Sequence, residues 1–191
     1  MGKAYEEYIK REKISRDFSK EIANIIYKYF SDAVIEKEVR DYQEEANEKA
    51  RNQYFSQALV HESKGEFDKA LEFYLFAVEL KHGEACYKAG EYYLYGKGVA
   101  VNHEKAFFYY SLSAKYLYFP ANAKLASCYL YGIGTKIEVE KALDLLELGS
   151  FVDDEDCINM LADLYESGRF VEQDYELADY LRCKIIPEGI A

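Results

Sequence analysis

The side chains that could perform acid–base or metal chemistry are few in this sequence, and their spacing indicates no active site. Three histidines occur, at His61, His82 and His103, and none belongs to an HExxH motif or a nucleophile-elbow pattern. The cysteines form no CxxC pair and have no histidine at zinc-ligand spacing. They are Cys86, Cys128, Cys157 and Cys183. We therefore expect no catalytic residue, no metal site and no cofactor, and reduced, buried thiols in a cytoplasmic protein.

Carboxylates are abundant, but they indicate a charged surface rather than a site. The 191 residues include 35 Asp plus Glu against 24 Lys plus Arg, a formal net charge of -11. The acidic run at residues 153–156 lacks the alternating ligands and turn glycine of a calcium loop, so we interpret it as charge that the dipole favours at a helix N-terminus. A surface this acidic repels phosphates, which argues against nucleic acid as a partner.

The composition favours a folded, helical protein without a membrane segment. Half of the residues are apolar, 16% are aromatic and only 2 are proline. The long stretches between turn residues are rich in Ala, Leu, Glu, Lys and Tyr, which are compatible with helices rather than with a sandwich or barrel. Residues 1–7 are charged and contain no apolar core, so we expect neither a secretory signal nor a membrane partner.

The elements that would have to position any functional residue appear as an internal repeat with a period of 36 residues. The positions that recur are Ala85 and Ala121; Gly90, Ala126 and Ala162; Tyr93, Tyr129 and Tyr165; Gly96, Gly132 and Gly168; Gly98 and Gly134; and Ala106, Ala142 and Ala178. Phe170 stands where the third copy should have its second glycine. An earlier, shorter copy has its small residues at Ala58 and Ala70. Four helical hairpins therefore fill residues 48–187.

Each repeated position has a physical role in such a hairpin. The small residues lie where its two helices must approach closely, because a larger side chain would separate them. A large residue follows three positions after each second alanine and supplies an apolar stripe for the neighbouring hairpin. These residues are Phe73, Tyr109, Leu145 and Leu181. The paired glycines end the first helix and permit a positive φ in the loop.

The spacing resembles that of Sel1-like repeats over residues 85 onward, while residues 51–84 resemble a tetratricopeptide repeat, a close relative with a shorter loop. The resemblance rests on Ala89-Gly90, Tyr93, Gly96, Gly98 and Lys105-Ala106 and their repeats. It implies an all-α fold, a right-handed α-α solenoid of four helical hairpins, which binds other proteins and has no catalytic residues. The tryptophan that is usual in the second helix is replaced by Tyr109, Leu145 and Leu181.

Residues 1–47 are expected to form an N-terminal helical cap on the solenoid of residues 48–191. Apolar residues at three- and four-residue steps predict a helix over residues 15–30 that begins near Ser15, with a break at Ser31-Asp32. A second stripe through Ile35, Val39 and Tyr42 runs on into the first repeat helix. Solenoid ends need such a cover. The alternative is a coiled coil that joins two copies of the chain into a homo-oligomer.

Three functions are compatible with this architecture. The first is a non-catalytic adaptor or scaffold that binds another protein. The second is an acidic inhibitor or immunity-type protein that masks one basic partner. The third is a hydrolase-like enzyme related to cysteine-rich Sel1-like proteins. The resemblance implies paired cysteines in every repeat of that last group, whereas only Cys86 occupies such a site and Ala114 stands at its partner position.

We expect the partner to bind the inner face of the solenoid, because the resemblance implies that first helices line the concave surface. The residues predicted there are Tyr87, Glu91, Leu94, Tyr95, Ser127, Leu130, Tyr131, Asn159, Asp163 and Glu166. They combine aromatic anchors with carboxylates, so a basic helix or extended peptide should fit. Leu94, Tyr95, Leu130 and Tyr131 precede the loop glycines, and packing under the loop is the alternative for them. The lysine and asparagine clamp of some tetratricopeptide proteins is absent from these positions.

Overall fold

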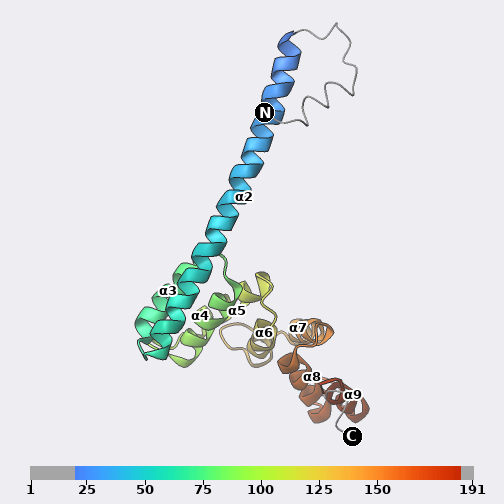
Figure 1. The fold of residues 1–191 in the computed structure, drawn as a ribbon. Coiled ribbons are helices and arrows are strands. Elements are labelled where there is room, and N and C mark those ends of the chain that lie inside the picture. The colour runs from blue at the N-terminus through green and yellow to red at the C-terminus, as the bar shows by residue number, and fades with distance from the viewer. Residues whose placement is uncertain (1–19, 186–191) are drawn as a thin grey trace. The chain divides into compact units, whose positions relative to one another are not determined.

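The computed structural model describes residues 20–185, with the side chains of Lys28, Asp32 and all residues from Val34 to Ile185. This part of the chain contains eight helices and no strand, which confirms the all-α prediction. The helices are α2 (Lys20–Ser63), α3 (Phe67–Glu79), α4 (Gly83–Tyr95), α5 (His103–Lys115), α6 (Ala121–Tyr131), α7 (Val139–Phe151), α8 (Glu155–Ser167) and α9 (Tyr175–Ile185) (Figure 1). The chain divides into two compact units, residues 1–48 and 49–191.

The first unit consists, where it is described, of the N-terminal part of α2. The helix continues through Ser31-Asp32, so the predicted break is wrong. Without a glycine or proline, one pair of weak helix formers is too small a penalty to end a helix. The predicted start near Ser15 lies outside the described residues. Val34, Ile35, Val39 and Tyr42 are 53–76% exposed. Cap and coiled coil both stay predictions.

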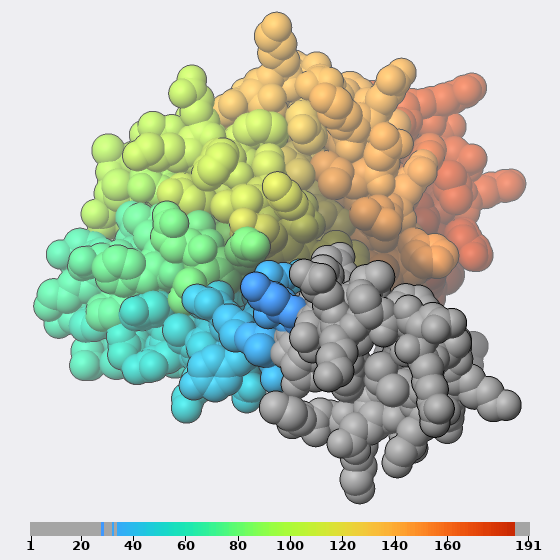
Figure 2. All heavy atoms as spheres, turned by 90° about the horizontal axis from the view of Figure 1, so that it is seen from above, coloured from blue at the N-terminus to red at the C-terminus, as the bar shows by residue number. Residues whose placement is uncertain are grey.

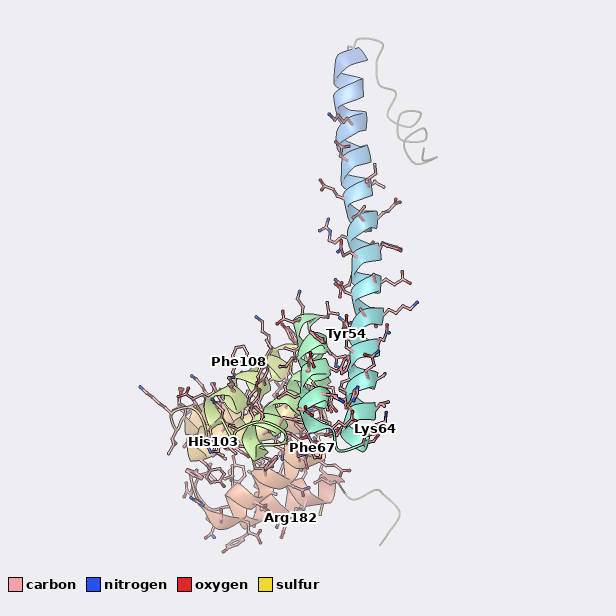
Figure 3. All side chains as sticks on the ribbon, turned by 90° about the vertical axis from the view of Figure 1, so that its left-hand side faces the viewer. Tyr54, Lys64, Phe67, His103, Phe108 and Arg182 are labelled. Carbon is pink, nitrogen blue, oxygen red and sulfur yellow. The ribbon has the colours of Figure 1, made fainter. Side chains whose placement is uncertain are left out.

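The second unit consists of four helical hairpins, as the period predicted. The C-terminal part of α2 pairs with α3 through Tyr54 and Phe76, whose ring centroids are 5.5 Å apart (Figure 3). The other hairpins are α4–α5, α6–α7 and α8–α9, and each packs against the next. In the space-filling view the colours of residues 49–185 follow one another in chain order, from cyan to red (Figure 2).

The small repeated residues lie at the helix contacts, as expected. All eight are buried: Ala58, Ala70, Gly90, Ala106, Ala126, Ala142, Ala162 and Ala178. Gly90 is the tightest of them, because a Cβ atom built on it would lie 2.7 Å from Cε1 of Tyr110. The Tyr110 ring therefore packs directly on the backbone of α4, and the glycine is required by that close approach.

The loop glycines adopt the predicted positive φ and also bring neighbouring hairpins together. Gly98 and Gly134 have φ of 66° and 69°. A Cβ on Gly134 would lie 1.9 Å from the carbonyl oxygen of His103, so the loop of the third hairpin rests on the start of α5. In the fourth hairpin Phe170 adopts φ of 80° without being glycine. Its half-buried ring instead packs against the core of the last two hairpins.

A second set of positive φ values occurs in the turns between hairpins, which sequence analysis did not foresee. Lys81, Leu117 and Asp153, each separated by one period of 36 residues, have φ of 64°, 60° and 59°. None is glycine, although the left-handed region is unfavourable for side chains with a Cβ atom. The repeat therefore imposes a backbone conformation that the residue types do not reveal.

Side chains cap the starts of four helices, including α9, where Oδ1 of Asp174 accepts from the amide of Leu177. The Nδ1 atom of His82 accepts a hydrogen bond from the amide of Ala85 at 3.2 Å, and Asn102 and Asp154 cap α5 and α8 in the same way. Glu155 and Asp156 lie in the first turn of α8. The acidic run at residues 153–156 therefore lies at a helix N-terminus, as interpreted from the sequence.

The four cysteines are free, and three of them are buried. Burial raises the pKa of the Cys86 thiol to about 12 and that of Cys128 to about 11, so both remain protonated at neutral pH. Cys183 is exposed on α9, which corrects the expectation that every thiol is buried. This residue falls on the solvent side of the last described helix, where no hairpin packs against it.

Candidate protein-binding site

The predicted binding residues lie on the first helices of hairpins two to four, namely α4, α6 and α8. We call the surface that these helices form the first-helix face. Helices α6 and α8 contact each other directly as well as through α7, so the first helices of the last two hairpins lie side by side. The face can therefore present residues of more than one repeat to a single partner.

The α4 part of the face is built around tyrosines. The half-buried ring of Tyr87 has its centroid 5.8 Å from that of Tyr110 and 5.5 Å from that of Tyr118. Burial, followed by the charge of Glu91, raises the pKa of Tyr87, so its hydroxyl stays protonated. The Tyr110 hydroxyl is buried and has no hydrogen-bond partner among the described residues. Tyr95, at the end of α4, is 57% exposed.

Glu91 is not a free carboxylate. Lys88 lies between two acidic residues, with its Nζ 3.9 Å from Oε2 of Glu91 and 3.8 Å from Oε2 of Glu62 on α2. All three side chains are only 18–26% exposed. A basic group of a partner must therefore share Glu91 with Lys88, which weakens this part of the predicted acidic wall.

A groove of about 530 Å3 lies between α6 and α8. Four of the predicted residues line it: Ser127, Tyr131, Asn159 and Asp163. Tyr131 is 49% exposed, and Asn159 and Asp163 are exposed on the facing helix. The structure thus brings together residues from two repeats that lie about one period apart in the sequence, beside an aromatic ring that can be desolvated by a partner.

Two of the predicted residues face the core instead. Leu130 is only 1% exposed and packs with Ala162 and Leu161 in the core of the last two hairpins, so it is not available for binding. Leu94 is half-buried against the core that the first three hairpins share. Each precedes an exposed tyrosine by one residue, and a step of one residue turns a helix by about 100°. The apolar member of each Leu-Tyr pair therefore faces inward.

Two acidic residues of α8, Asp163 and Glu166, are engaged by an arginine from α9. Arg182, labelled in Figure 3, donates to Oδ1 of Asp163 at 2.8 Å and also to Glu166. The hydrogen bond from Arg182 lowers the pKa of Glu166, so this carboxylate remains charged in mildly acidic solution. The chain's own arginine thus occupies the place in which a basic residue of a partner was expected.

Sequence reasoning missed the cations of this face. Lys124, Met160 and Arg169 also line the groove, and Lys88, Lys124 and Met160 are separated by one period of 36 residues. Lys88 and Lys124 lie three residues before the predicted Glu91 and Ser127, so the helical spacing could have identified them. The guanidinium carbon of Arg169 lies 5.3 Å from the Tyr131 ring centroid, a cation–π contact.

The histidines have structural roles rather than a shared site. Nδ1 of His61 lies 2.6 Å from Oε2 of Glu66, and its ring stacks on Phe73 with centroids 5.1 Å apart. His82 caps α4 and stacks on Phe55. His103 begins α5 at the surface (Figure 3). Among the residues whose side chains are described, no three His, Cys, Asp or Glu residues form a metal-binding cluster.

Comparison with known families supports the repeat assignment. The sequence profile of the Sel1 repeat matches residues 83–115, 120–150 and 156–178. These stretches correspond to hairpins α4–α5, α6–α7 and α8–α9, which confirms the resemblance inferred from the 36-residue period. The first hairpin precedes them, and its tetratricopeptide-like character stays a prediction. A search of curated proteins returns no match.

Two solved structures have a similar fold. A Sel1 repeat protein from Oxalobacter formigenes superposes with a TM-score of 0.68 at 23% identity, covering 76% of this chain and 62% of that protein. A protective antigen of uropathogenic Escherichia coli strains, which displays an SLR fold, gives 0.66 at 20% identity and covers 79% and 33%. The chain spans less than two thirds of either protein, and the likeness concerns the fold alone.

Proposed function

Because this chain contains three Sel1 repeats, we propose that it is a non-catalytic interaction module, an adaptor or scaffold, that binds a basic segment of another protein on its first-helix face. Sel1 repeats generally mediate protein–protein interaction. The observation that carries the proposal is the groove between α6 and α8, in which Ser127, Tyr131, Asn159 and Asp163 meet. Within the described residues no helix is both long enough and apolar enough to cross a membrane.

The groove supports binding by an aromatic anchor with polar surroundings. Tyr131 presents a half-exposed ring that already holds one guanidinium, that of Arg169, over its face. A lysine or arginine of the partner can bind the ring in the same manner. Asp156, an exposed acidic residue at the groove, adds a carboxylate that steers a basic segment toward it. Asn159 and Ser127 supply hydrogen-bonding groups.

The ion pairs of Arg182 set the energetic condition for this binding. Asp163 already accepts a hydrogen bond from Arg182. A basic group of the partner must therefore displace this arginine or share the carboxylate with it. Because both ions of such a pair are at the surface, the exchange costs little. We therefore expect moderate affinity with strong dependence on salt concentration, as is usual for charge-steered interfaces.

Affinity capture from a lysate of the source organism, with identification by mass spectrometry, tests the proposal. Three baits are compared: the unaltered chain, a Tyr131→Arg, Asp163→Lys variant, and a Tyr180→Arg control whose exposed tyrosine lies on α9. We expect the groove variant to lose the main partner and the control to retain it. A groove variant that has the same circular dichroism spectrum and still captures the same partner would refute the proposal.

A double variant, Tyr87→Arg, Tyr131→Arg, extends the test to α4. Tyr87 packs on Tyr110 and Tyr118, so its replacement affects folding as well as binding. The stability of this variant must be measured beside its binding. Loss of the partner by the Tyr131 variant alone would place the contact at α6 and α8, and further loss on adding Tyr87→Arg would extend it to α4.

A further inference from the structure

Two exposed apolar residues lie at successive connections between hairpins, and neither lines the groove between α6 and α8. Leu117, between α5 and α6, is 75% exposed, and Phe151, at the end of α7, is 84% exposed. Leu117 also has φ of 60°, an unfavourable backbone conformation for leucine. The side chain gains almost no burial in return. Burial of this side chain therefore contributes little to the stability of the folded chain.

The equivalent positions of the other repeats are charged, as expected for solvent. Lys81 and Asp153 stand one period before and after Leu117 and share its positive φ. Glu79 and Lys115 precede Phe151 by two periods and one period. Leu117, directly after the second hairpin, and Phe151, at the end of the third, are thus apolar where the other repeats have charged residues. The scaffold itself does not require this exchange.

Further apolar residues accompany these two. Phe119 follows Leu117 in its turn, and Leu148 and Val152 flank Phe151, with exposed fractions of 37–50%. We call Leu117, Phe119, Leu148, Phe151 and Val152 the turn edge. The two turns lead into α6 and α8, which contact each other, so they belong to neighbouring hairpins.

The charges beside the turn edge are mainly acidic. Glu147 precedes Phe151 by one helical turn, and Glu155 begins α8 directly after the turn; both are exposed, as is Lys115 two residues before Leu117. Asp153 is paired with Lys184 at 2.8 Å. The surface therefore combines exposed apolar side chains with carboxylates that form no ion pair within the described residues, and it would repel an anionic membrane.

We propose that the turn edge of hairpins two and three binds a basic amphipathic helix of a partner protein, at a surface separate from the first-helix face. An amphipathic helix presents apolar residues at i and i+7 on one side, and these can contact the apolar residues of the two turns. Residues at i+3 and i+4 complete the apolar stripe. Lysine and arginine on its flanks face Glu147 and Glu155, neither of which lines the groove.

The test uses a designed helical peptide of leucine and lysine with this apolar spacing, titrated against the full chain by fluorescence anisotropy. Leu117→Gly, Phe151→Gln is the test variant. Lys81→Gly, Phe108→Gln is the matched control, because Lys81 shares the backbone conformation and Phe108 is an exposed phenylalanine on α5 (Figure 3). We expect the test variant to bind about tenfold more weakly, and the control to bind as the unaltered chain does.

Stability distinguishes a binding role from a folding role. Leu117→Gly and Lys81→Gly both remove an unfavourable φ, so both should keep or raise the melting temperature, while only the first weakens binding. The same titrations in the Tyr131→Arg, Asp163→Lys background, which blocks the groove, should still show weaker binding by the test variant than by the control, which separates this surface from the groove.

Equal binding by the test variant and the control would overturn the proposal. The proposal would also be overturned if a peptide with glutamate in place of lysine, or a scrambled leucine–lysine peptide, bound the unaltered chain as tightly as the designed peptide does. Binding of phosphatidylcholine vesicles that Leu117→Gly, Phe151→Gln abolishes would assign the turn edge to lipid and also overturn it.

Discussion

Arg182 stands where the earlier hairpins have a buried core residue, and it forms an ion pair with Glu166. The equivalent residues, at intervals of 36, are Tyr74, Tyr110 and Leu146, all of them fully buried. Glu166 in turn occupies the position of Leu94 and Leu130. Two positions that are apolar in the earlier hairpins therefore hold a surface ion pair in the last described hairpin, which makes this part of the first-helix face polar.

Replacing Arg182 should strengthen binding of basic segments. In Arg182→Gln, Asp163 and Glu166 lose the cation that now holds them, and the pKa of Glu166 returns toward its ordinary value. We expect tighter binding of a basic peptide in the groove and a steeper dependence on salt, measured by titration at several ionic strengths. Lys184→Gln is the control, since Lys184 pairs with Asp153 outside the groove. Weaker binding by Arg182→Gln would show that the arginine contacts the partner itself.

Gly90→Ala should destabilise the fold. The added Cβ would lie 2.7 Å from the Tyr110 ring, so the helices of this hairpin must separate or the ring must move, at a cost of about 1–3 kcal/mol. Urea denaturation measures the change. The double variant Gly90→Ala, Tyr110→Leu recreates the Ala126 and Leu146 pair of the next hairpin and should recover part of the loss. A destabilisation that the second substitution does not relieve would contradict this explanation.

Lys81→Gly should stabilise the fold or leave it unchanged. Lys81 has φ of 64°, which costs a side chain about 1–2 kcal/mol, whereas glycine costs about 0.5–1 kcal/mol in backbone entropy. The expected net gain is at most about 1 kcal/mol, measured by urea denaturation. The Lys81→Val variant, which has a β-branched residue in the same conformation, should be less stable than the unaltered protein. The reverse order of the two variants would be incompatible with a strained turn.

Stability should fall as the pH decreases through the range in which unfolded histidine titrates. Burial, followed by the charge of Arg51, lowers the pKa of His82 in the folded state. The unfolded chain therefore binds a proton more readily, and stability is lost as the pH falls below about 6.5. Protonation also removes the lone pair of Nδ1 that accepts from Ala85. His82→Asn keeps a capping oxygen without this titration and should reduce the pH dependence, as measured by thermal unfolding between neutral and mildly acidic pH.

Thiol reactivity should separate Cys183 from the other cysteines. In the native protein we expect one of the four thiols to react rapidly with a disulfide reagent, because only Cys183 is exposed. The remaining three should react after denaturation. Cys183→Ser should abolish the fast phase without changing stability. Rapid reaction of two or more thiols in the folded Cys183→Ser protein would contradict the buried positions of Cys86, Cys128 and Cys157.

The local features of the repeat could be derived from the sequence alone. A period of 36 residues, with small residues at the close contacts, predicted the hairpins and the burial of Ala58 and Ala106, and the loop glycines predicted their positive φ. These features follow from sterics within one hairpin, so they recur with the residues that cause them. The same reasoning predicted a break at Ser31-Asp32 that α2 does not have, because propensity at two residues is weaker than the helix on either side.

Tertiary structure decided which residues of the first helices are accessible. Helical periodicity groups residues into faces, but the packing of the next hairpin determines which face is covered, and it buries Leu130 while leaving Tyr131 half-exposed. The contact of α6 with α8 creates the groove, and the reach of Arg182 across to α8 neutralises part of its acidic wall. The left-handed turn at Leu117 is likewise imposed by the stacking of hairpins. Sequence therefore determined the repeating unit, whereas the contacts between units determined its binding surfaces.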